Sequence, residues 1–127
     1  MIEFDVYAHL SGHAEITAFV GDEIYPIILP QREEPYPSSW AGITYFLVSH
    51  PEVYSKDGPS GLSFPRMQIS VWSPSYTKAK QLAELVKAAM HGYAEFATKE
   101  NEDDIYEADT KLYHIPLDFI IQHKEVI

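Results

Sequence analysis

The sequence predicts a single α+β domain, in which an antiparallel or mixed β-sheet of four to five strands has two helices packed on one face. Residues 66–72 alternate polar and apolar side chains with period two, as a strand with one buried face does. Residues 74–91 carry apolar side chains at helical spacing behind Ser73 and Pro74, which suit a helix cap and a first turn. Strand-like segments with short links lie on both sides of this helix, an order that favours an antiparallel sheet covered by helices on one side.

Composition narrows the class of protein. The chain has 127 residues, 46% of them hydrophobic, which is enough for one packed domain. It has no cysteine, so disulfides, thiolate metal sites and cysteine nucleophiles are excluded. Nineteen acidic residues against nine basic ones give a net charge of −10, which disfavours binding to phosphate backbones. The first residues carry no basic region, and no apolar run approaches the roughly 18 residues of a membrane span, so we expect synthesis in the cytoplasm and no membrane contact.

The N-terminal part of the chain predicts one helix and two strands. The first twenty residues partly follow a helical apolar stripe, and Gly12 marks the point where this helix weakens or breaks. Residues 24–29 form a short apolar run whose Pro26 suits an edge strand or a strand start. Residues 43–48 are β-branched or aromatic on both faces, so we expect a strand whose second face is buried or meets another protein.

Loops and a final strand are expected in the rest of the chain. Residues 51–65 are rich in serine, glycine and proline, which predicts a long loop or a hairpin tip. Six acidic residues lie within positions 100–109, and we expect a solvated loop there that runs into a strand at 105–108. A last strand is expected over 112–123, where Pro116 indicates an edge or a bulge because proline cannot donate a ladder hydrogen bond.

No catalytic set stands out in the sequence. His9 and His13 are four residues apart and could share one helix face as metal ligands do, but the acid of a metalloprotease motif is missing and Gly12 weakens the helix. The sequence contains neither a nucleophile elbow nor a phosphate-binding glycine loop. The acids at 100–109 are typical of a solvated patch rather than a catalytic pair. We therefore expect no catalytic residue, no metal and no cofactor, and a protein that is not an enzyme.

Aromatic side chains indicate an interaction surface. The chain has nine tyrosines, six phenylalanines and two tryptophans, and tyrosine and tryptophan are enriched where proteins meet. Several lie in or beside proline-rich and glycine-rich loops, where either a partner covers them or they fold back as local lids. The candidate contact residues for other subunits or partners are Tyr36, Trp40, Tyr54, Lys56, Leu62, Phe64 and Arg66.

One segment carries a family resemblance. Residues 16–26 read Ile-Thr-Ala-Phe-Val-Gly-Asp-Glu-Ile-Tyr-Pro and are followed by Leu29-Pro30-Gln31. With these residues the sequence resembles the phage tail-completion family, the tail terminators and head-to-tail joining proteins of long-tailed phages and related prophages. Members of that family have a helix that ends in a similar Val-Gly-Asp-x-Ile-Tyr stretch, followed by Pro-Gln and a later proline. Pro35 or Pro37 takes the place of that later proline here.

The resemblance continues through the strand at 68–73, the helix that holds Ala79, Leu82, Ala83 and Val86, and the strand at 113–121, so it covers nearly the whole chain. It departs in the 51–65 loop and the acidic 100–109 stretch. It implies a structural virion protein that forms a homo-hexameric ring at the head-proximal end of the tail. Such a ring caps the tail tube protein, stops tube polymerisation and gives the head connector or stopper protein a docking surface. The resemblance also implies that DNA passes through the pore of the ring.

An acidic lining suits such a pore because carboxylates repel DNA phosphates. The candidate pore-facing acids are Glu100, Glu102, Asp103 and Asp104. Two alternatives stay open. The first is a head-completion or connector protein of the same particle. The second, from a different class, is a small α+β ligand-binding domain or metal-dependent enzyme that uses His9 and His13.

Overall fold

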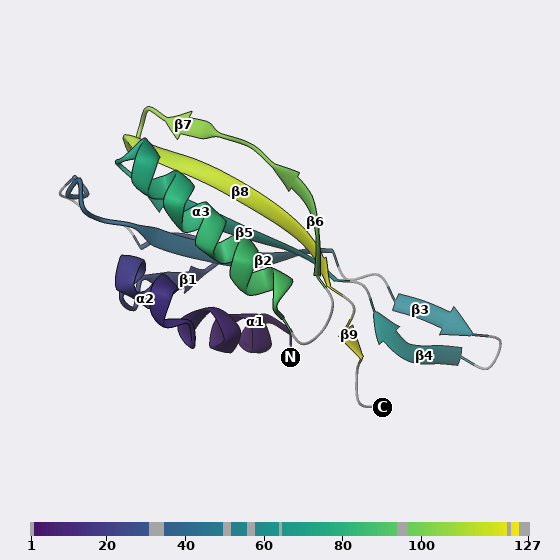
Figure 1. Ribbon diagram of the computed structural model, residues 1–127. Helices are drawn as coiled ribbons and strands as arrows, with labels where there is room; N and C mark the ends of the chain where they lie inside the picture. The colour runs from purple at the N-terminus through teal and green to yellow at the C-terminus, as the bar shows by residue number, and fades with distance from the viewer. Residues whose placement is uncertain are drawn as a thin grey trace.

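The computed structural model describes residues 2–30, 35–49, 52–55, 58–63, 65–93, 97–121 and 123–124. In these residues a six-stranded, mostly antiparallel sheet packs against three helices, and a small three-stranded sheet extends from one end (Figure 1). The α+β fold class is therefore confirmed. The described residues contain three helices where two were expected, and six strands in the large sheet where four to five were expected.

The large sheet has the strand order β1-β2-β5-β8-β6, and β7 pairs with β8 on the side that β6 also occupies. Its strands are β1 (Ile24–Pro26), β2 (Gly42–Ser49), β5 (Arg66–Ser73), β6 (Ala97–Glu102), β7 (Ile105–Glu107) and β8 (Leu112–Ile121). The small sheet consists of β3 (Glu52–Ser55), β4 (Gly58–Ser63) and β9 (His123–Lys124). Strand β1 runs parallel to β2 and forms one edge of the large sheet, while β6 and β7 form the other edge.

The three helices are α1 (Ile2–Ser11), α2 (Ala14–Val20) and α3 (Tyr76–His91), and they lie on one face of the large sheet (Figure 1). The break expected near Gly12 is confirmed, because α1 ends at Ser11 and α2 begins at Ala14. The expected cap of the long helix was wrong by two residues. Ser75 caps α3 by accepting a hydrogen bond from the backbone N–H of Lys78 at 3.3 Å, whereas Ser73 lies in β5.

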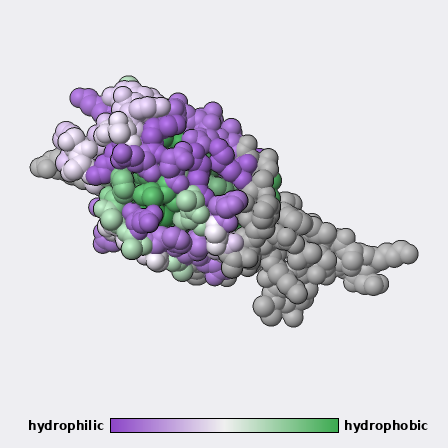
Figure 2. All heavy atoms as spheres, viewed as in Figure 1, coloured by the Kyte–Doolittle hydropathy of each residue, from purple (hydrophilic) through white to green (hydrophobic). Residues whose placement is uncertain are grey.

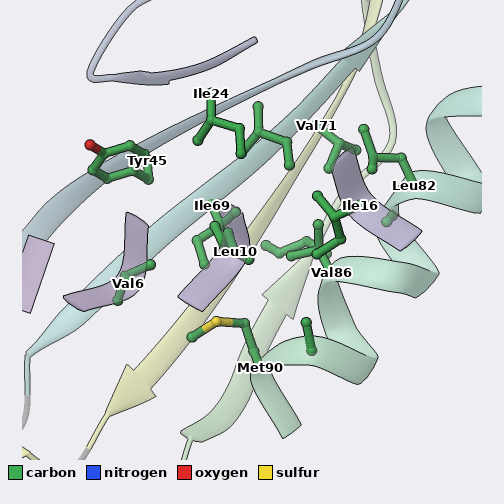
Figure 3. Close-up of a cluster of buried hydrophobic side chains, with 14 of the residues drawn as sticks. Val6, Leu10, Ile16, Ile24, Tyr45, Ile69, Val71, Leu82, Val86 and Met90 are labelled. Atoms are coloured by element: carbon green, nitrogen blue, oxygen red, sulfur yellow. The ribbon is translucent and has the colours of Figure 1, made fainter. Parts of the chain in front are cut away.

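The hydrophobic core fills the space between the helices and the inner face of the sheet (Figure 3). The inward face expected for β5 is confirmed, since Met67, Ile69 and Val71 are fully buried. On the other face Gln68 is partly buried, but Ser70 is buried as well. Helix α3 contributes its apolar stripe, which comprises Ala79, Leu82, Ala83, Val86, Ala89 and Met90. Residues from α1 and α2 complete the cluster, so all three helices share one core with the sheet.

One expectation about a short segment was wrong and another was confirmed. The strand expected at 24–29 ends at Pro26, because Ile27 adopts a left-handed backbone conformation with φ of 69° that cannot continue a strand. The stretch at 51–65, expected as a long loop or a hairpin tip, contains the antiparallel hairpin of strands β3 and β4. Its composition did not indicate the bounds of these strands, because serine, glycine and proline carry no alternation of apolar side chains.

The acidic stretch and the last strand also differ from expectation. Residues 97–102 form edge strand β6, although the acids from position 100 onward predicted a loop. Pro116 lies in β8, which is an internal strand paired with β5 on one side and with β6 and β7 on the other. That second ladder is interrupted between Leu117, which pairs with Glu102, and His114, which pairs with Ile105. Pro116 is tolerated because it falls in this interruption.

Leu82 provides a test of the packing of α3. It is fully buried in the core, so the substitution Leu82→Ala should lower the free energy of unfolding by about 2–5 kcal/mol, through lost apolar burial and the cavity left behind. The control Leu82→Met, which nearly conserves volume, should cost less than about 1.5 kcal/mol. Urea denaturation of both variants measures the difference. A loss below about 1 kcal/mol for Leu82→Ala would contradict the packing described here.

Candidate assembly interface

The outer face of the sheet carries a cluster of polar and aromatic side chains. The indole of Trp72 stacks on the His114 ring, with ring centroids 3.8 Å apart and planes 7° apart. The Trp72 Nε1–H donates a hydrogen bond to the hydroxyl of Thr44 at 2.9 Å. This cluster joins β2, β5 and β8 on the side opposite the helices. The helices cover only the inner face (Figure 1). On the second face of residues 43–48, Thr44 is buried whereas Val48 is exposed, and contact of this face with another protein stays a prediction.

The surroundings of His114 disfavour the charged form of its ring. Burial lowers the pKa of His114 below its ordinary value, against the opposing effect of Glu107, whose carboxylate lies 3.5 Å from Nδ1. The buried Nε2 atom of His114 has no hydrogen-bond partner among the described residues. Protonation of this ring would place a charge beside the Trp72 indole with little solvent to stabilise it.

Aromatic residues before β2 fold back onto the protein. The rings of Tyr36 and Trp40 lie 4.2 Å apart and, with Glu23 and Tyr25, line a shallow pocket. A Cβ atom on Gly42 would lie only 2.5 Å from the Trp40 ring, so glycine at this position lets the indole rest on the strand. Tyr25 donates a hydrogen bond to the Glu23 carboxylate, and this bond raises the pKa of Tyr25 to about 12.

The expected contact residues do not form one site. Tyr36 and Trp40 precede β2, whereas Tyr54 in β3 and Leu62 in β4 belong to the hairpin beyond its other end (Figure 1). Arg66 begins β5 and is partly buried. Lys56 and Phe64 lie outside the described residues. Eight residues of β2, about 26 Å of extended chain, separate the two groups. The contact role of these residues stays a prediction.

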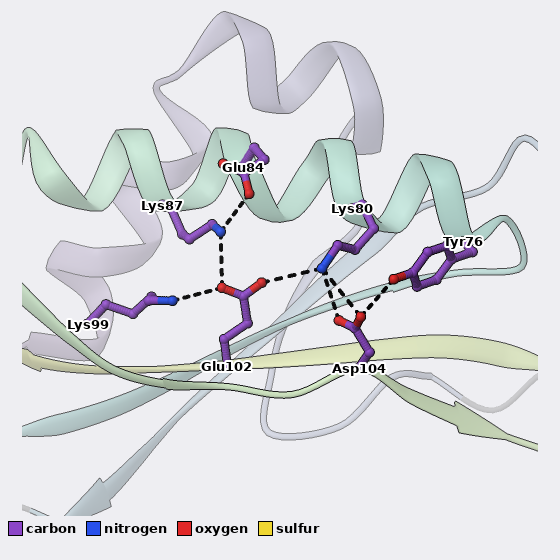
Figure 4. A network of polar contacts seen from close by, with 7 residues as sticks. All are labelled: Tyr76, Lys80, Glu84, Lys87, Lys99, Glu102 and Asp104. Atoms are coloured by element: carbon purple, nitrogen blue, oxygen red, sulfur yellow. Dashed lines mark hydrogen bonds and ion pairs between the residues drawn. The ribbon is translucent and has the colours of Figure 1, made fainter.

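A network of ion pairs joins α3 to edge strand β6 (Figure 4). The Glu102 carboxylate lies 3.0 Å from the Lys87 ammonium, 2.8 Å from that of Lys99 and 3.6 Å from that of Lys80. The hydrogen bond from Lys99, helped by Lys87, lowers the pKa of Glu102 to about 2 despite partial burial. Lys80 and Lys87 come from α3, so the network fixes the edge strand to the helix.

The same network includes Asp104, just beyond the end of β6. Its carboxylate accepts a hydrogen bond from the Tyr76 hydroxyl at 2.7 Å and lies 3.2 Å from the Lys80 ammonium. The Tyr76 hydrogen bond, with Lys80, lowers the pKa of Asp104 below its ordinary value. Lysines therefore compensate two of the four acids expected to line a pore.

The other two candidate pore acids have different surroundings. Asp103 is exposed and accepts a hydrogen bond from the Asn101 amide at 3.2 Å. Glu100 lies in β6, and its side chain is outside the described set. The pore-facing role of all four acids stays a prediction. Glu102 and Asp104, however, form ion pairs with lysines and are not uncompensated charges.

The two N-terminal histidines bond to backbone carbonyls rather than to each other. The Nε2–H of His9 donates to the carbonyl of Ala89 in α3 at 2.6 Å, and the Nδ1–H of His13 donates to the carbonyl of His9 at 2.7 Å. Within the described ranges no group of three or more histidine and acidic side chains could hold a metal ion. The His9 ring joins α1 to α3, and the His13 ring binds a carbonyl near the end of α1. This geometry gives no support to the alternative of a metal-dependent enzyme.

Large exposed apolar side chains were missed by the sequence reasoning. Ile27 and Ile28 follow β1 with 72% and 74% of their surfaces exposed, and Ile105 and Tyr106 on β7 are 42% and 53% exposed. The sequence placed Ile27 and Ile28 inside a strand, and only the turn at Ile27 shows otherwise. The face seen in Figure 2 is mostly hydrophilic over α3, with a smaller hydrophobic area nearer α2. No helix among the described residues is long and apolar enough to cross a membrane.

Glu102 gives a prediction with a defined pH dependence. Its folded-state pKa of about 2 lies below the ordinary 4.5, so the ionised carboxylate stabilises the fold fully above pH 4.5 and this contribution is lost as the pH falls toward 2. Glu102→Gln should therefore lower the free energy of unfolding by about 1–2 kcal/mol near neutral pH. Urea denaturation at a series of pH values should show the gap between wild type and variant closing below pH 4.5.

Asp103→Asn is the matched control for this variant. Asp103 is exposed, and its contact to Asn101 is weak, so the variant should change stability by less than about 0.5 kcal/mol at any pH. A gap for Glu102→Gln that stayed constant down to low pH would show that the lysine network does not hold the carboxylate in its ionised form.

Comparison with known proteins finds a solved structure of the same fold and a family that matches the sequence. The structure is similar to a chain in the virion of a native gene transfer agent (GTA) particle, with a TM-score of 0.72 and 18% sequence identity. The match covers 94% of this chain and 91% of that chain, and at this identity it shows the fold alone. No curated protein matches the sequence. The family described as "Tail completion protein gp17" matches residues 5–124. Because this match spans nearly the whole sequence, the chain belongs to the tail completion protein gp17 family.

Proposed function

We propose that this tail-completion protein is a tail terminator, a homo-hexameric ring that caps the tail tube, stops its polymerisation and offers a docking surface to the head connector. Family membership supports a structural phage protein of this kind. The similar chain from a gene transfer agent particle supports assembly with other virion proteins. The ring itself, its place at the head-proximal end of the tail and the passage of DNA through its pore are parts of the proposal.

The observation that carries the proposal is an open sheet with two different edges. Strand β1 has one neighbour among the described strands, and so does each of β6 and β7 on the opposite edge. A subunit with two different edges can contact its neighbours head to tail, and such contacts close into a ring when the rotation between copies permits. Open sheet edges are also the usual places for contact with another chain.

The β3–β4 hairpin supports a second contact. It extends from the end of the large sheet, beyond β2 and β5, and β9 pairs with β4 (Figure 1). A protruding arm of this kind can reach a neighbouring subunit or the tube without disturbing the core. We assign this role to the hairpin that holds Tyr54 and Leu62, two of the contact residues expected from sequence.

The distribution of charge supports passage of DNA without adhesion. Residues 1–30 contain five acids and neither lysine nor arginine. Asp5 on α1, Glu15 on α2 and Asp22 in the turn after α2 are exposed. Since lysines compensate Glu102 and Asp104, we propose that the α1–α2 side, rather than β6, turns negative charge toward DNA.

Assembly of the purified protein tests the ring. Native mass spectrometry should detect a hexamer of the 14.5 kDa chain, either alone or after addition of tail tube protein from the same particle. Electron microscopy should show that the protein shortens tubes when present during polymerisation and sits at one tube end. An acidic protein of similar size serves as the control and should leave tube length unchanged.

Two outcomes would contradict the proposal. If the protein stayed monomeric at high concentration and in the presence of tubes, the proposed ring would be contradicted. A protein that binds purified connector rings but leaves tube growth unchanged would favour the head-completion or connector alternative instead.

A further inference from the structure

Large exposed apolar side chains gather at both edges of the sheet. Ile27 and Ile28 form a corner directly after β1, and we call them the isoleucine corner. Ile105 of β7 pairs with His114 and lies on the outer face, whereas Tyr106 and the exposed Tyr76 of α3 form a patch on the helix side of this opposite edge, which we call the β7 patch. The ring of Tyr113 joins this patch, because it lies 5.2 Å from that of Tyr76 and 4.9 Å from that of Tyr106.

The isoleucine corner is held in a strained conformation. Ile27 has φ of 69°, a left-handed conformation in which a β-branched residue is a genuine outlier. The Ile28 N–H donates to the carbonyl of Pro26 at 2.7 Å, which closes a tight turn around Ile27. The Ile27 N–H donates to the carbonyl of Tyr45 at 2.9 Å and fixes this turn to β2.

An isolated subunit gains nothing from this arrangement. Glycine or asparagine would adopt the left-handed conformation at lower cost, and a polar side chain would be better solvated at so exposed a position. Backbone strain of this kind persists where surrounding structure enforces it, and it gathers at sites of function. Exposed isoleucines on a strained, well-anchored turn therefore fit a surface that another molecule covers.

We propose that the isoleucine corner of one copy packs against the β7 patch of the next copy, head to tail. The two surfaces lie on opposite edges of one sheet, so a closed ring of such contacts covers every corner and every patch. An apolar centre rich in tyrosine is typical of stable interfaces between subunits. The proposal rests on the ring of the proposed function and assigns the residues that join its subunits.

Side-chain packing, rather than strand addition, forms this contact. Strand β1 has only three residues, one of them Pro26, which has no N–H to donate. Strand β7 is equally short. Edges this short offer few free ladder groups, whereas the corner and the patch offer large apolar side chains whose burial stabilises the contact.

Complementary charge variants test the contact. Ile28→Lys and Tyr106→Glu, each made in the full chain, should raise the protein concentration at half-assembly at least about tenfold, because each buries a charge at the interface. In a mixture of the two variants, Lys-bearing corners face Glu-bearing patches and intact corners face intact patches. The mixture should therefore recover hexamers, with the two copies alternating around the ring. Mass photometry with mass-labelled copies measures both effects.

Ala88→Lys is the matched control. Ala88 is an exposed apolar residue on α3 that lies in neither surface, so its substitution should leave assembly unchanged. Circular dichroism and thermal unfolding confirm that every variant is folded. Variants that assemble like wild type, while wild type forms rings, would overturn the assigned contact and leave the ring standing. A wild-type protein that forms no ring alone or on tubes would overturn both. Mixtures that yield only dimers would overturn the head-to-tail arrangement.

Ile27→Gly separates stability from assembly. Glycine adopts positive φ without a side-chain clash, so the unfolding temperature of the unassembled variant should be at least as high as that of wild type. Loss of the apolar side chain should at the same time weaken assembly by about tenfold in concentration. A variant that is at least as stable as wild type and assembles as well would show that Ile27 makes no contact between copies.

Discussion

The pairing of β5 with β8 is the interaction on which the rest of the structure depends. All eight residues of β5 pair with β8, from Arg66 opposite Ile120 to Ser73 opposite Tyr113. This register places Ile69 opposite Leu117, and both are fully buried beneath the helices. Strand β2 adds to the free side of β5, and β6 and β7 add to the free side of β8. A one-residue slip would turn these apolar side chains to the outer face, so core and edges both follow from this register.

Helix α3 extends the influence of that pairing to the edge of the sheet. Its apolar stripe packs on β5 and β8, and the lysines on its other side reach β6. Glu102 and Asp104 accept those lysines, so part of the negative charge of the chain serves to fix an edge strand that few apolar side chains would hold. Other acids, such as Asp5, Glu15 and Asp22, are exposed on the surface, and negative charge there disfavours contact with phosphate backbones.

Assembly, rather than a pocket, suits the chemistry of this protein. The apolar side chains of α3 and of the inner sheet face are buried in the core. The outer face carries the cluster of Trp72, His114 and Thr44. Large apolar surface remains mainly at edges and turns, and its most exposed part, at Ile27 and Ile28, rests on a strained backbone. A structural tail-completion protein works through contacts with other virion proteins, which is where such surface is useful.

The sequence by itself determined the regular parts of the fold and the family. The alternation of Arg66–Trp72 and the stripe of residues 74–91 were sufficient because period two and period 3.6 follow directly from strand and helix geometry. The structure of the segments at the sheet edges, in contrast, is determined by tertiary contacts. Strand β6 forms because β8 offers a free ladder and α3 offers lysines, and the turn at Ile27 forms because the Tyr45 carbonyl holds it. These segments lack a local pattern, so contacts between residues distant in sequence determine their structure, and the candidate interface lies among them.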